Sequence, residues 1–269
     1  MRLGLVTDLH VAPLPHAPAR WHNDYDFDGA CGRAKAALSA LAGEGVDAVA
    51  ALGDLTNAGD DDSLDTVLGI LSASGLHTLV VPGNHDCEVT ADALSRAVGR
   101  ADGAVQTLSP SPQKVAGLPV AGISLSRPPA GRGFGAASMP ELDGEATLVV
   151  SHFPVISRRE RVKAAGYKYA GDLVGLEDLS GLLAGEQSPV IVVSGHLHVR
   201  DAVVSGRVLQ ILVPAMIEPP YECAVLEVAG DPLTVTYQAI AVEPTPPGLD
   251  VPLLTPAEGR WVLGASGWE

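Results

Sequence analysis

Aromatic residues, cysteine and basic residues are all scarce in this chain of 269 residues. Phe, Trp and Tyr make up only 4% of the chain although 46% of it is hydrophobic, so Ala, Val and Leu supply most of the apolar content. This composition favours a compact protein of sheets and helices and argues against a disordered or fibrous one. The length suits one large α/β domain or two small ones.

Cysteine usage indicates a reducing compartment. Cys31, Cys87 and Cys223 are odd in number and widely spaced, so they predict no disulfide framework. No apolar run approaches the length of a transmembrane helix, and the opening run Leu3–Val6 is shorter than the apolar core of a signal peptide. We therefore expect a cytoplasmic protein that does not bind a membrane.

Basic residues are few enough to exclude one class of partner. Lys and Arg number 17 against 32 Asp and Glu, which gives a formal charge of −15. A diffuse negative charge repels nucleic acid and anionic lipid, so we expect no extended nucleic-acid surface. An anionic substrate would have to bind at a local positive spot, which bound metal ions can provide.

Five apolar runs of strand length each end at a polar motif. The runs are continuous rather than alternating, which predicts strands buried on both faces. The carboxyl ends of parallel strands meet at one edge of a sheet, so we expect the motifs to lie together there. The runs are Leu3–Val6, Ala48–Leu52, His77–Val81, Ala146–Val150 and Val190–Val193.

Amphipathic stretches between these runs predict helices. In the second of them, Leu64, Val67, Leu68 and Leu71 recur at helical spacing, and we expect the N-cap at Asp61 or Asp62. The alternation of strand and helix predicts a layered α/β fold. The expected helices cover Gly29–Ala42, Ser63–Ala73, Ala91–Val98 and Leu176–Leu183.

After residue 198 the pattern changes to consecutive strands. Tight turns at Ser205-Gly206 and Gly230-Asp231 predict an antiparallel second sheet packed on the first. The expected architecture is a four-layer α-β-β-α sandwich of two mixed sheets flanked by helices. The additional strands are expected over Asp201–Val204, Val208–Val213, Cys223–Val228 and Leu233–Ala241.

Proline becomes dense from Glu243 onward. We expect residues 1–242 to form the catalytic domain, and residues 243–269 to form a tail packed on that domain or on a partner subunit of a homo-oligomer. Trp261 and Trp268 would anchor such a tail. The alternative is a partly disordered end.

The polar motifs supply metal-ligand side chains in a fixed order. In a strand, residues i and i+2 point to the same side, so Asp8 and His10 could reach one ion, and Gly53 permits a sharp turn that places the Asp54 carboxylate between two ions. Imidazole and carboxylate suit Zn, Fe and Mn. Each motif alone is weak, and the prediction rests on their coincidence. The motifs are Asp8-x-His10, Gly53-Asp54, Gly83-Asn84-His85-Asp86, Ser151-His152 and Gly195-His196-x-His198.

In these motifs the chain resembles the calcineurin-like metallophosphoesterases, over roughly residues 3–200. The resemblance implies two divalent or trivalent metal ions (Fe, Mn or Zn), His85 as the group that contacts the phosphate and assists the leaving group, and Asp86 as its support. It implies that one ion is bound by Asp8, His10, Asp54 and His198. It implies that the other is bound by Asp54, Asn84, His152 and His196.

The resemblance also bears on the substrate. The stretch Gly53–Gly59 is similar to that of class III cyclic-nucleotide and glycerophosphodiester phosphodiesterases. It implies hydrolysis of small or cyclic nucleotide-like diesters by a water activated between the two ions. The alternatives are a phosphomonoesterase or nucleotidase of the same fold, and a metal-binding scaffold without turnover.

A basic segment just past His152 is a second candidate for contact with a small phosphate ester. Its cations could attract an anion and its tyrosines could stack on a base, although a solvated helix face explains the charges equally well. Residues in the long loop after the first motif and in the turn after Asp54 could also contact substrate, although they could simply be surface or turn residues. The candidates are His22, Asn57, Arg158, Arg159, Tyr167 and Tyr169.

Overall fold

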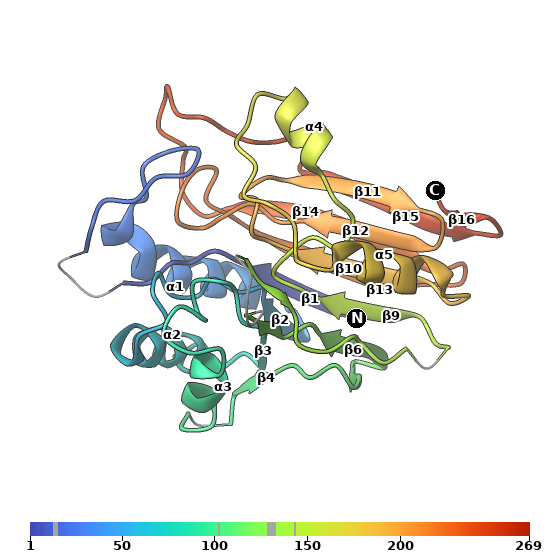
Figure 1. Ribbon diagram of the computed structural model, residues 1–269, viewed down its shortest axis with the longest axis horizontal. Helices are drawn as coiled ribbons and strands as arrows, with labels where there is room; N and C mark the ends of the chain where they lie inside the picture. The colour runs from blue at the N-terminus through green and yellow to red at the C-terminus, as the bar shows by residue number, and fades with distance from the viewer. Residues whose placement is uncertain (13–15, 102, 128–132, 143) are drawn as a thin grey trace.

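Two mixed sheets lie face to face in the computed structural model, with helices on their outer sides (Figure 1). The structure describes residues 1–12, 16–101, 103–127, 133–142 and 144–269. The four-layer α-β-β-α sandwich expected from the sequence is confirmed.

The first sheet has eight strands in the order β16-β15-β14-β13-β1-β2-β3-β4. Strands β1 to β4 run parallel, whereas β13 pairs antiparallel with β1 and begins the antiparallel half. The strands are β1 (Arg2–Val6), β2 (Ala48–Ala51), β3 (Thr78–Val80), β4 (Val105–Thr107), β13 (Glu222–Ala229), β14 (Thr234–Ala241), β15 (Glu258–Gly264) and β16 (Gly267–Trp268).

The second sheet has six strands in the order β11-β12-β10-β9-β6-β5. Its four central strands are parallel and its two edge strands are antiparallel to their neighbours. A two-stranded hairpin, β7 (Leu125–Ser126) with β8 (Gly135–Ala136), stands apart. The sheet contains β5 (Gln113–Val115), β6 (Leu118–Gly122), β9 (Thr147–Val150), β10 (Val190–Ser194), β11 (Asp201–Ser205) and β12 (Val208–Leu212).

The helices divide between the two outer faces. Helices α1 to α3 pack their apolar sides on the first sheet, where Leu41 and Leu64 meet Val49. Helix α5 packs on the second sheet, where Leu179 meets Val192. The helices are α1 (Phe27–Gly43), α2 (Asp61–Ala73), α3 (Ala93–Val98), α4 (Arg159–Ala164) and α5 (Leu176–Gly185).

The central core fills the space between the sheets. Leu5 and Leu52 of the first sheet pack in one cluster with Val150 and Ile191 of the second, all fully buried. Because both faces of β1, β2, β9 and β10 are covered, these strands are apolar at nearly every position. The continuous apolar runs in the sequence are explained by this double burial.

The strands after residue 198 do not form one sheet, contrary to expectation. Strands β11 and β12 extend the second sheet, whereas the chain returns through β13 and β14 to the first. Strand β13 pairs with β1, with Leu226 opposite Leu3, and is buried along most of its length. An apolar run predicts that a segment forms a strand, but it does not predict which strand it pairs with. The five motifs therefore come from two facing sheet edges, three from the first and two from the second.

The N-cap of α2 differs from the expected residue, and the C-terminal tail contains strands that were not expected. Asp60, not Asp61 or Asp62, is the N-cap of α2, because its Oδ1 accepts from the Ser63 amide at 2.9 Å. In the tail, β15 pairs with β14, and the buried Trp268 donates its indole N–H to the Arg207 carbonyl at 2.9 Å. The division of the chain at residue 242 stays a prediction. Within the described residues, no helix combines the length and the apolar character needed to cross a bilayer.

Candidate metal centre

All seven predicted metal ligands converge at the carboxyl ends of five strands. Asp8 and His10 follow β1, Asp54 follows β2, Asn84 follows β3, His152 follows β9, and His196 and His198 follow β10. Six of the seven are buried, and Asn84 is half-buried. Such a cluster of buried polar groups at one place requires partners.

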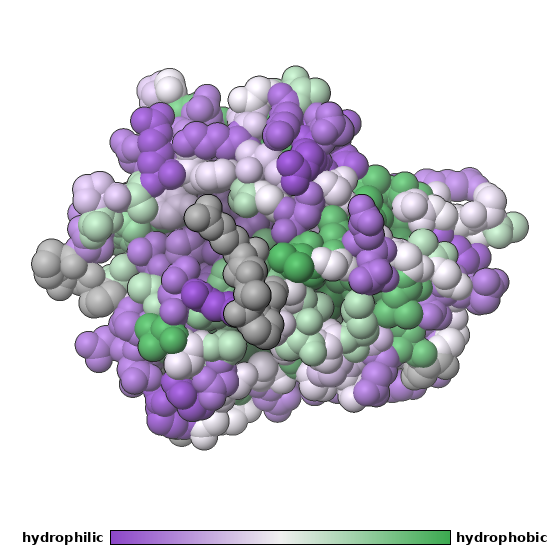
Figure 2. Space-filling model, in the orientation of Figure 1, coloured by the Kyte–Doolittle hydropathy of each residue, from purple (hydrophilic) through white to green (hydrophobic). Residues whose placement is uncertain are grey.

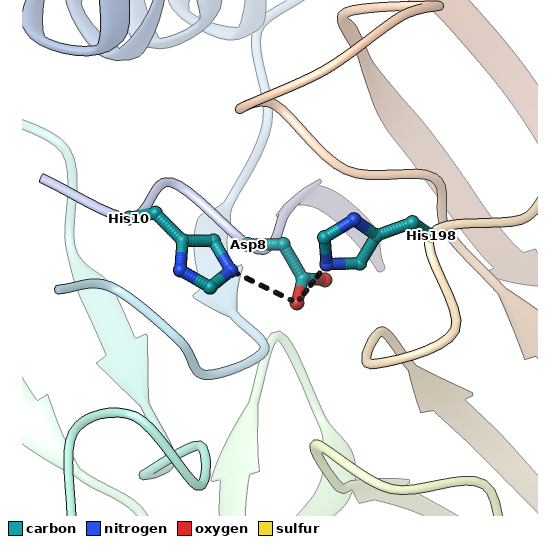
Figure 3. Close-up of side chains that lie close together, drawn as sticks. All are labelled: Asp8, His10 and His198. Atoms are coloured by element: carbon teal, nitrogen blue, oxygen red, sulfur yellow. Dashed lines mark ion pairs between the residues drawn. The ribbon is translucent and has the colours of Figure 1, made fainter. Parts of the chain in front are cut away.

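One group of ligand atoms centres on the Asp8 carboxylate. Figure 3 shows the imidazoles of His10 and His198 approaching this carboxylate from opposite sides. Asp8 Oδ1 lies 3.2 Å from His198 Nε2 and 3.9 Å from His10 Nε2. Two ligands bound to one ion at about 2.0–2.1 Å in tetrahedral geometry stand about 3.3 Å apart, so these separations fit a shared ion.

A second group centres on Asp54. Its Oδ2 lies 3.3 Å from His152 Nε2 and 3.7 Å from His10 Nε2, so this carboxylate reaches both groups. His152 Nε2 also lies 3.2 Å from Asn84 Oδ1. The Leu52 carbonyl accepts from His152 Nδ1 at 2.9 Å, which fixes the proton on Nδ1 and leaves the Nε2 lone pair of the neutral ring for a metal.

Buried atoms without partners test whether metal ions fit here. Asp8 Oδ1, both ring nitrogens of His10 and Nε2 of His196 are buried and form no hydrogen bond among the described residues. A buried donor or acceptor left unpaired costs about 1–3 kcal/mol. Asp8 Oδ1, His10 Nε2 and His196 Nε2 are oxygen and imidazole nitrogen atoms that Zn, Fe or Mn bound in the cluster would satisfy. The residues present therefore fit two ions.

The backbone is strained where the ligands are placed. Seven described non-glycine residues have a positive φ, and five of them are predicted ligands: Asp8, His10, Asp54, His196 and His198, with φ between 46° and 68°. Such residues occupy the left-handed region, which side chains other than glycine adopt at a cost. Strain of this kind persists where the surrounding structure imposes it and is concentrated at functional sites.

Two motif glycines allow this close approach. A Cβ on Gly195 would lie 2.0 Å from Thr7 Oγ1 and 2.5 Å from Asp8 Oδ2. Gly53 has a φ of 93°, and a Cβ there would lie 2.8 Å from His152 Nδ1. Because neither position can accommodate a side chain, the glycines bring the two sheet edges together.

Burial and neighbouring charges shift the pKa values of the histidines and aspartates in the cluster. Burial lowers the pKa of His10 and of His196 to about 3, so both rings are neutral. Burial also opposes protonation of His152 and His198, but the Asp54 carboxylate raises the pKa of His152 to about 9, and Asp8 with Glu218 raises that of His198 to about 10. Against the effect of burial, the neighbouring imidazoles lower the pKa of Asp8 to about 2 and hold that of Asp54 well below its usual range.

His85 and Asp86 occupy different positions in the site. His85 Nδ1 donates to the Asn57 carbonyl at 2.8 Å, which leaves Nε2 as the nitrogen available to a substrate. The Asp86 carboxylate is buried and accepts from the amides of Leu55, Thr56 and Gly83. Burial and the nearby Asp54 raise the pKa of Asp86 to about 6. Asp86 thus ties the β2 and β3 loops together, and its support of His85 is indirect.

Glu218 is a site residue that the sequence reasoning missed. Its buried carboxylate lies 2.6 Å from His198 Nδ1 and accepts from the amides of His22 and Asn23. It therefore fixes the orientation of one metal-ligand candidate, as carboxylates behind ligating histidines commonly do. The available signal was an acid between Ile217 and Pro219 in an otherwise apolar stretch.

A cavity of about 250 Å³ opens beside the cluster. Its floor includes Asp54, Asn84, His85, His196 and His198. Aromatic residues that the sequence reasoning did not assign to the site form part of its wall. These are Trp21 and Tyr25, which line it together with Tyr169 and Ala170.

The predicted substrate-binding residues do not all reach this cavity. Tyr169 lines it, and Asn57 is next to it through the bond from His85. Buried His22 bonds the Leu197 carbonyl, and Tyr167 donates to the Val251 carbonyl at 3.0 Å. Their role as substrate ligands stays a prediction.

The two arginines of this set are paired with acids. Arg158 bonds the fully buried Asp201 at 2.8 Å, as Arg161 does at 2.9 Å, and Arg159 bonds Asp172 at 3.1 Å. Figure 2 shows hydrophilic residues gathered over α4 and the neighbouring loops, in the upper part of the view. A substrate role for Arg158 or Arg159 stays a prediction and would compete with these pairs.

Comparisons with known proteins agree with this geometry. The fold and the buried cluster of Asp and His residues define a metallophosphoesterase-type sandwich. The family model for calcineurin-like phosphoesterases matches residues 1–200, and the chain belongs to that family. No curated protein sequence matches the chain.

Solved structures share the fold at low sequence identity. A dimetal phosphatase from Danio rerio is 15% identical with a TM-score of 0.64, over 90% of this chain and 96% of that one. The protein TT1561 of Thermus thermophilus is 12% identical with a TM-score of 0.58, over 90% of this chain and 99% of that one. A purple acid phosphatase from yellow lupin (Lupinus luteus) is 12% identical with a TM-score of 0.53, over 96% of this chain and 53% of that one.

Proposed function

We propose that this protein hydrolyses phosphate esters at the strand-end cluster, with two metal ions bound there, and that it prefers diesters. The observation that carries the proposal is the set of unpaired buried ligand atoms shared around Asp8 and Asp54. Asp8, His10, Asp54 and His198 would bind one ion, and Asp54, Asn84, His152 and His196 the other. A pair of ions lowers the pKa of a bound water and withdraws charge from the phosphoryl group.

His85 supplies the remaining chemistry of this proposal. Its Nδ1 is held by the Asn57 carbonyl, so its Nε2 is free to contact the phosphate or protonate the departing oxygen. Ligand atoms of His85, His10 and Asp54 also lie within 4.8 Å of one another, so His85 could bind a metal ion instead. Metal retention in His85→Ala distinguishes a metal ligand from a group that acts on the substrate. Asp86 fixes the loop that carries His85 rather than the ring itself.

The charge of the cavity supports a diester substrate. Its lining contains no Lys or Arg within the described ranges, and the nearby Arg159 and Lys168 are bonded to Asp172 and to the Trp21 carbonyl, so the bound ions would be its main positive charge. A diester carries one negative charge and needs less compensation than a doubly charged monoester. The physiological substrate is expected to be a small diester of the nucleotide type.

A matched pair of esters tests the proposal. The purified protein is reconstituted separately with Mn, Fe, Zn and Co, and kcat/KM is measured for bis(p-nitrophenyl) phosphate and p-nitrophenyl phosphate. Faster cleavage of the diester supports the proposal. Preference for the monoester replaces it with a phosphomonoesterase or nucleotidase, and no turnover with both ions bound replaces it with a metal-binding scaffold.

A further inference from the structure

Three of the eleven aromatic residues of this chain (Phe, Trp and Tyr) line the cavity beside the metal cluster. The chain has three Trp and five Tyr, and Trp21, Tyr25 and Tyr169 all line this one cavity of about 250 Å³. In a protein whose core consists almost entirely of aliphatic residues, this gathering of rings at a solvent-accessible pocket is not explained by core packing.

Tyr25 differs from the other two because it packs on the metal cluster. Its ring stacks on His198 at 5.8 Å between centroids and lies 4.9 Å from His10. It therefore supports the predicted ligands. Trp21 and Tyr169 have no such ring contact with the described cluster histidines, so neither supports the predicted ligands in this way.

Both remaining rings carry a cation over their faces. The Lys168 ammonium lies 5.4 Å from the Trp21 ring, and the Arg159 guanidinium lies 5.1 Å from the Tyr169 ring. Because the rings contribute to the cavity wall, a planar group in the cavity would stack on them. A cationic group would instead meet two cations of the same sign close by, which disfavours it.

Hydrogen bonds hold the backbone at Trp21 and the hydroxyl of Tyr169 in place. The Trp21 carbonyl accepts from Lys168 Nζ at 2.6 Å, and the next two amides along the chain bind Glu218, which also bonds His198. The Tyr169 hydroxyl bonds the carboxylate of Asp172 and lies 3.2 Å from Ser157 Oγ. A single carboxylate, Glu218, thus links the Trp21 loop to a metal-ligand candidate.

We propose that Trp21 and Tyr169 form a subsite for a planar aromatic group, a nucleobase or an aryl ring, carried by the phosphate ester. The proposal rests on the proposed phosphoesterase site and adds the class of its organic substituent. Stacking of a base on an aromatic side chain changes affinity by about 5- to 150-fold on substitution.

Phosphonates test the subsite without turnover, because their P–C bond is not cleaved by ester hydrolysis. Dissociation constants of phenylphosphonate, cyclohexylphosphonate and methylphosphonate are measured by calorimetry on the Mn-loaded protein. Phenylphosphonate should bind more tightly than cyclohexylphosphonate, which has similar bulk but no flat π face. Equal affinities would overturn the proposal.

Substitutions assign the preference to the two rings. Trp21→Leu and Tyr169→Leu should each weaken phenylphosphonate binding by about 5-fold or more, and Trp21→Phe should retain most of the preference. Trp261→Leu, remote from the cavity in β15, should leave all three constants unchanged. An equal loss of methylphosphonate binding in Trp21→Leu would show a general structural role and overturn the assignment.

Two further measurements separate the remaining outcomes. Tighter binding of the phosphonate analogue of phosphocholine than of phenylphosphonate would replace the planar group with a quaternary ammonium.

Trp21 fluorescence should change on adding phenylphosphonate, and the change should vanish in Trp21→Phe, which retains Trp261 and Trp268. If the loaded protein neither binds methylphosphonate nor cleaves any ester, the proposed function fails. If methylphosphonate binds but phenylphosphonate binds no more tightly than cyclohexylphosphonate, only the proposed subsite fails.

Discussion

The strand-end loops and the basic segment of residues 157–172 both border the cavity, but they hold their polar groups in opposite ways. In the loops, His10 and His196 are buried with ring nitrogens that form no hydrogen bond. In the basic segment, Arg158, Arg159 and Arg161 each bond an acid. The region whose buried ring nitrogens are unpaired is therefore the stronger candidate for ligand binding.

Unpaired buried groups that gather in one place therefore favour a candidate site more than charge density does. A paired cation has already exchanged its water for a protein partner, and a new anion must compete with that partner. An unpaired buried imidazole has lost its water without compensation, so a bound ion restores the loss. Five variants or conditions test this difference, from the largest expected effect to the smallest.

Asp54→Ala should remove bound metal and nearly all hydrolysis of bis(p-nitrophenyl) phosphate. The Asp54 carboxylate reaches both ligand groups, at 3.7 Å from His10 and 3.3 Å from His152. Metal content by mass spectrometry and turnover are the measurements. Asp172→Ala, which removes a carboxylate from the basic segment, should keep its metal. Full metal content in Asp54→Ala would contradict the shared position of this residue.

His85→Ala should keep its metal and lose about 10²–10⁴-fold in kcat, most severely for esters with poor leaving groups. The reason is that Nε2 is the ring nitrogen of His85 left free to act at the cavity when Nδ1 bonds the Asn57 carbonyl. The exposed His77→Ala serves as the control. Unchanged turnover would remove His85 from the mechanism, and lost metal would make it a ligand.

Glu218→Gln should weaken metal affinity by about 10–100-fold, because it removes the charge that orients His198 at 2.6 Å. Titration of the metal-free protein with Zn in a competing chelator gives the affinity. Glu222→Gln changes a carboxylate whose buried partner is Arg200 and should leave metal affinity near that of the wild type. Equal effects of the two variants would show a loss of stability rather than of orientation.

Metal-free protein should lose stability as the pH rises, unlike the loaded protein. The pKa values of His152 and His198 are raised from 6.5 to about 9 and about 10. A raised histidine pKa stabilises the fold fully below pH 6.5 and loses this contribution as the pH rises through the folded value. Urea unfolding at pH 6.5, 8 and 9.5 measures the free energy. Parallel profiles with and without metal would argue that these rings are not ligands.

Arg158→Met should lower the free energy of unfolding by about 1.5–3 kcal/mol, because buried Asp201 loses one of its two charged hydrogen bonds. Exposed Lys163→Met is the matched control and should change little. The sequence also predicts substrate contact by Arg158. A rise in KM for Arg158→Met beyond that of Lys163→Met would support such contact.

The fold could be predicted from the sequence as far as local pattern carries information. The runs that became β1, β2, β9 and β10 were recognisable because burial on both faces makes every position apolar. The return of β13 to β1 was not, because it depends on long-range pairing such as Leu226 with Leu3. Short strands such as β7 and β8 have too few residues to show a period.

The same limit applies to the site. Within each sheet the motif residues could be placed together because the ends of parallel strands share an edge, but the meeting of the two sheet edges could not be predicted from this rule. Glu218 and Trp21 could not, because each reaches the site from a loop whose path is set by tertiary contacts. The basic segment misled in another way, since the sequence shows Arg158, Arg159 and Arg161 but does not show that they pair with Asp172 and Asp201.

The left-handed backbone at Asp8, His10, Asp54, His196 and His198 bears on how an inert version of this protein should be built. An alanine there removes the ligand and also tolerates the left-handed region poorly, so the unfolding transition of Asp54→Ala has to be compared with that of the wild type before its loss of metal is assigned to the missing ligand. Asparagine tolerates this conformation better than alanine. We therefore expect His10→Asn to give higher yields of folded, inactive protein than His10→Ala, which makes it the better reference for binding studies.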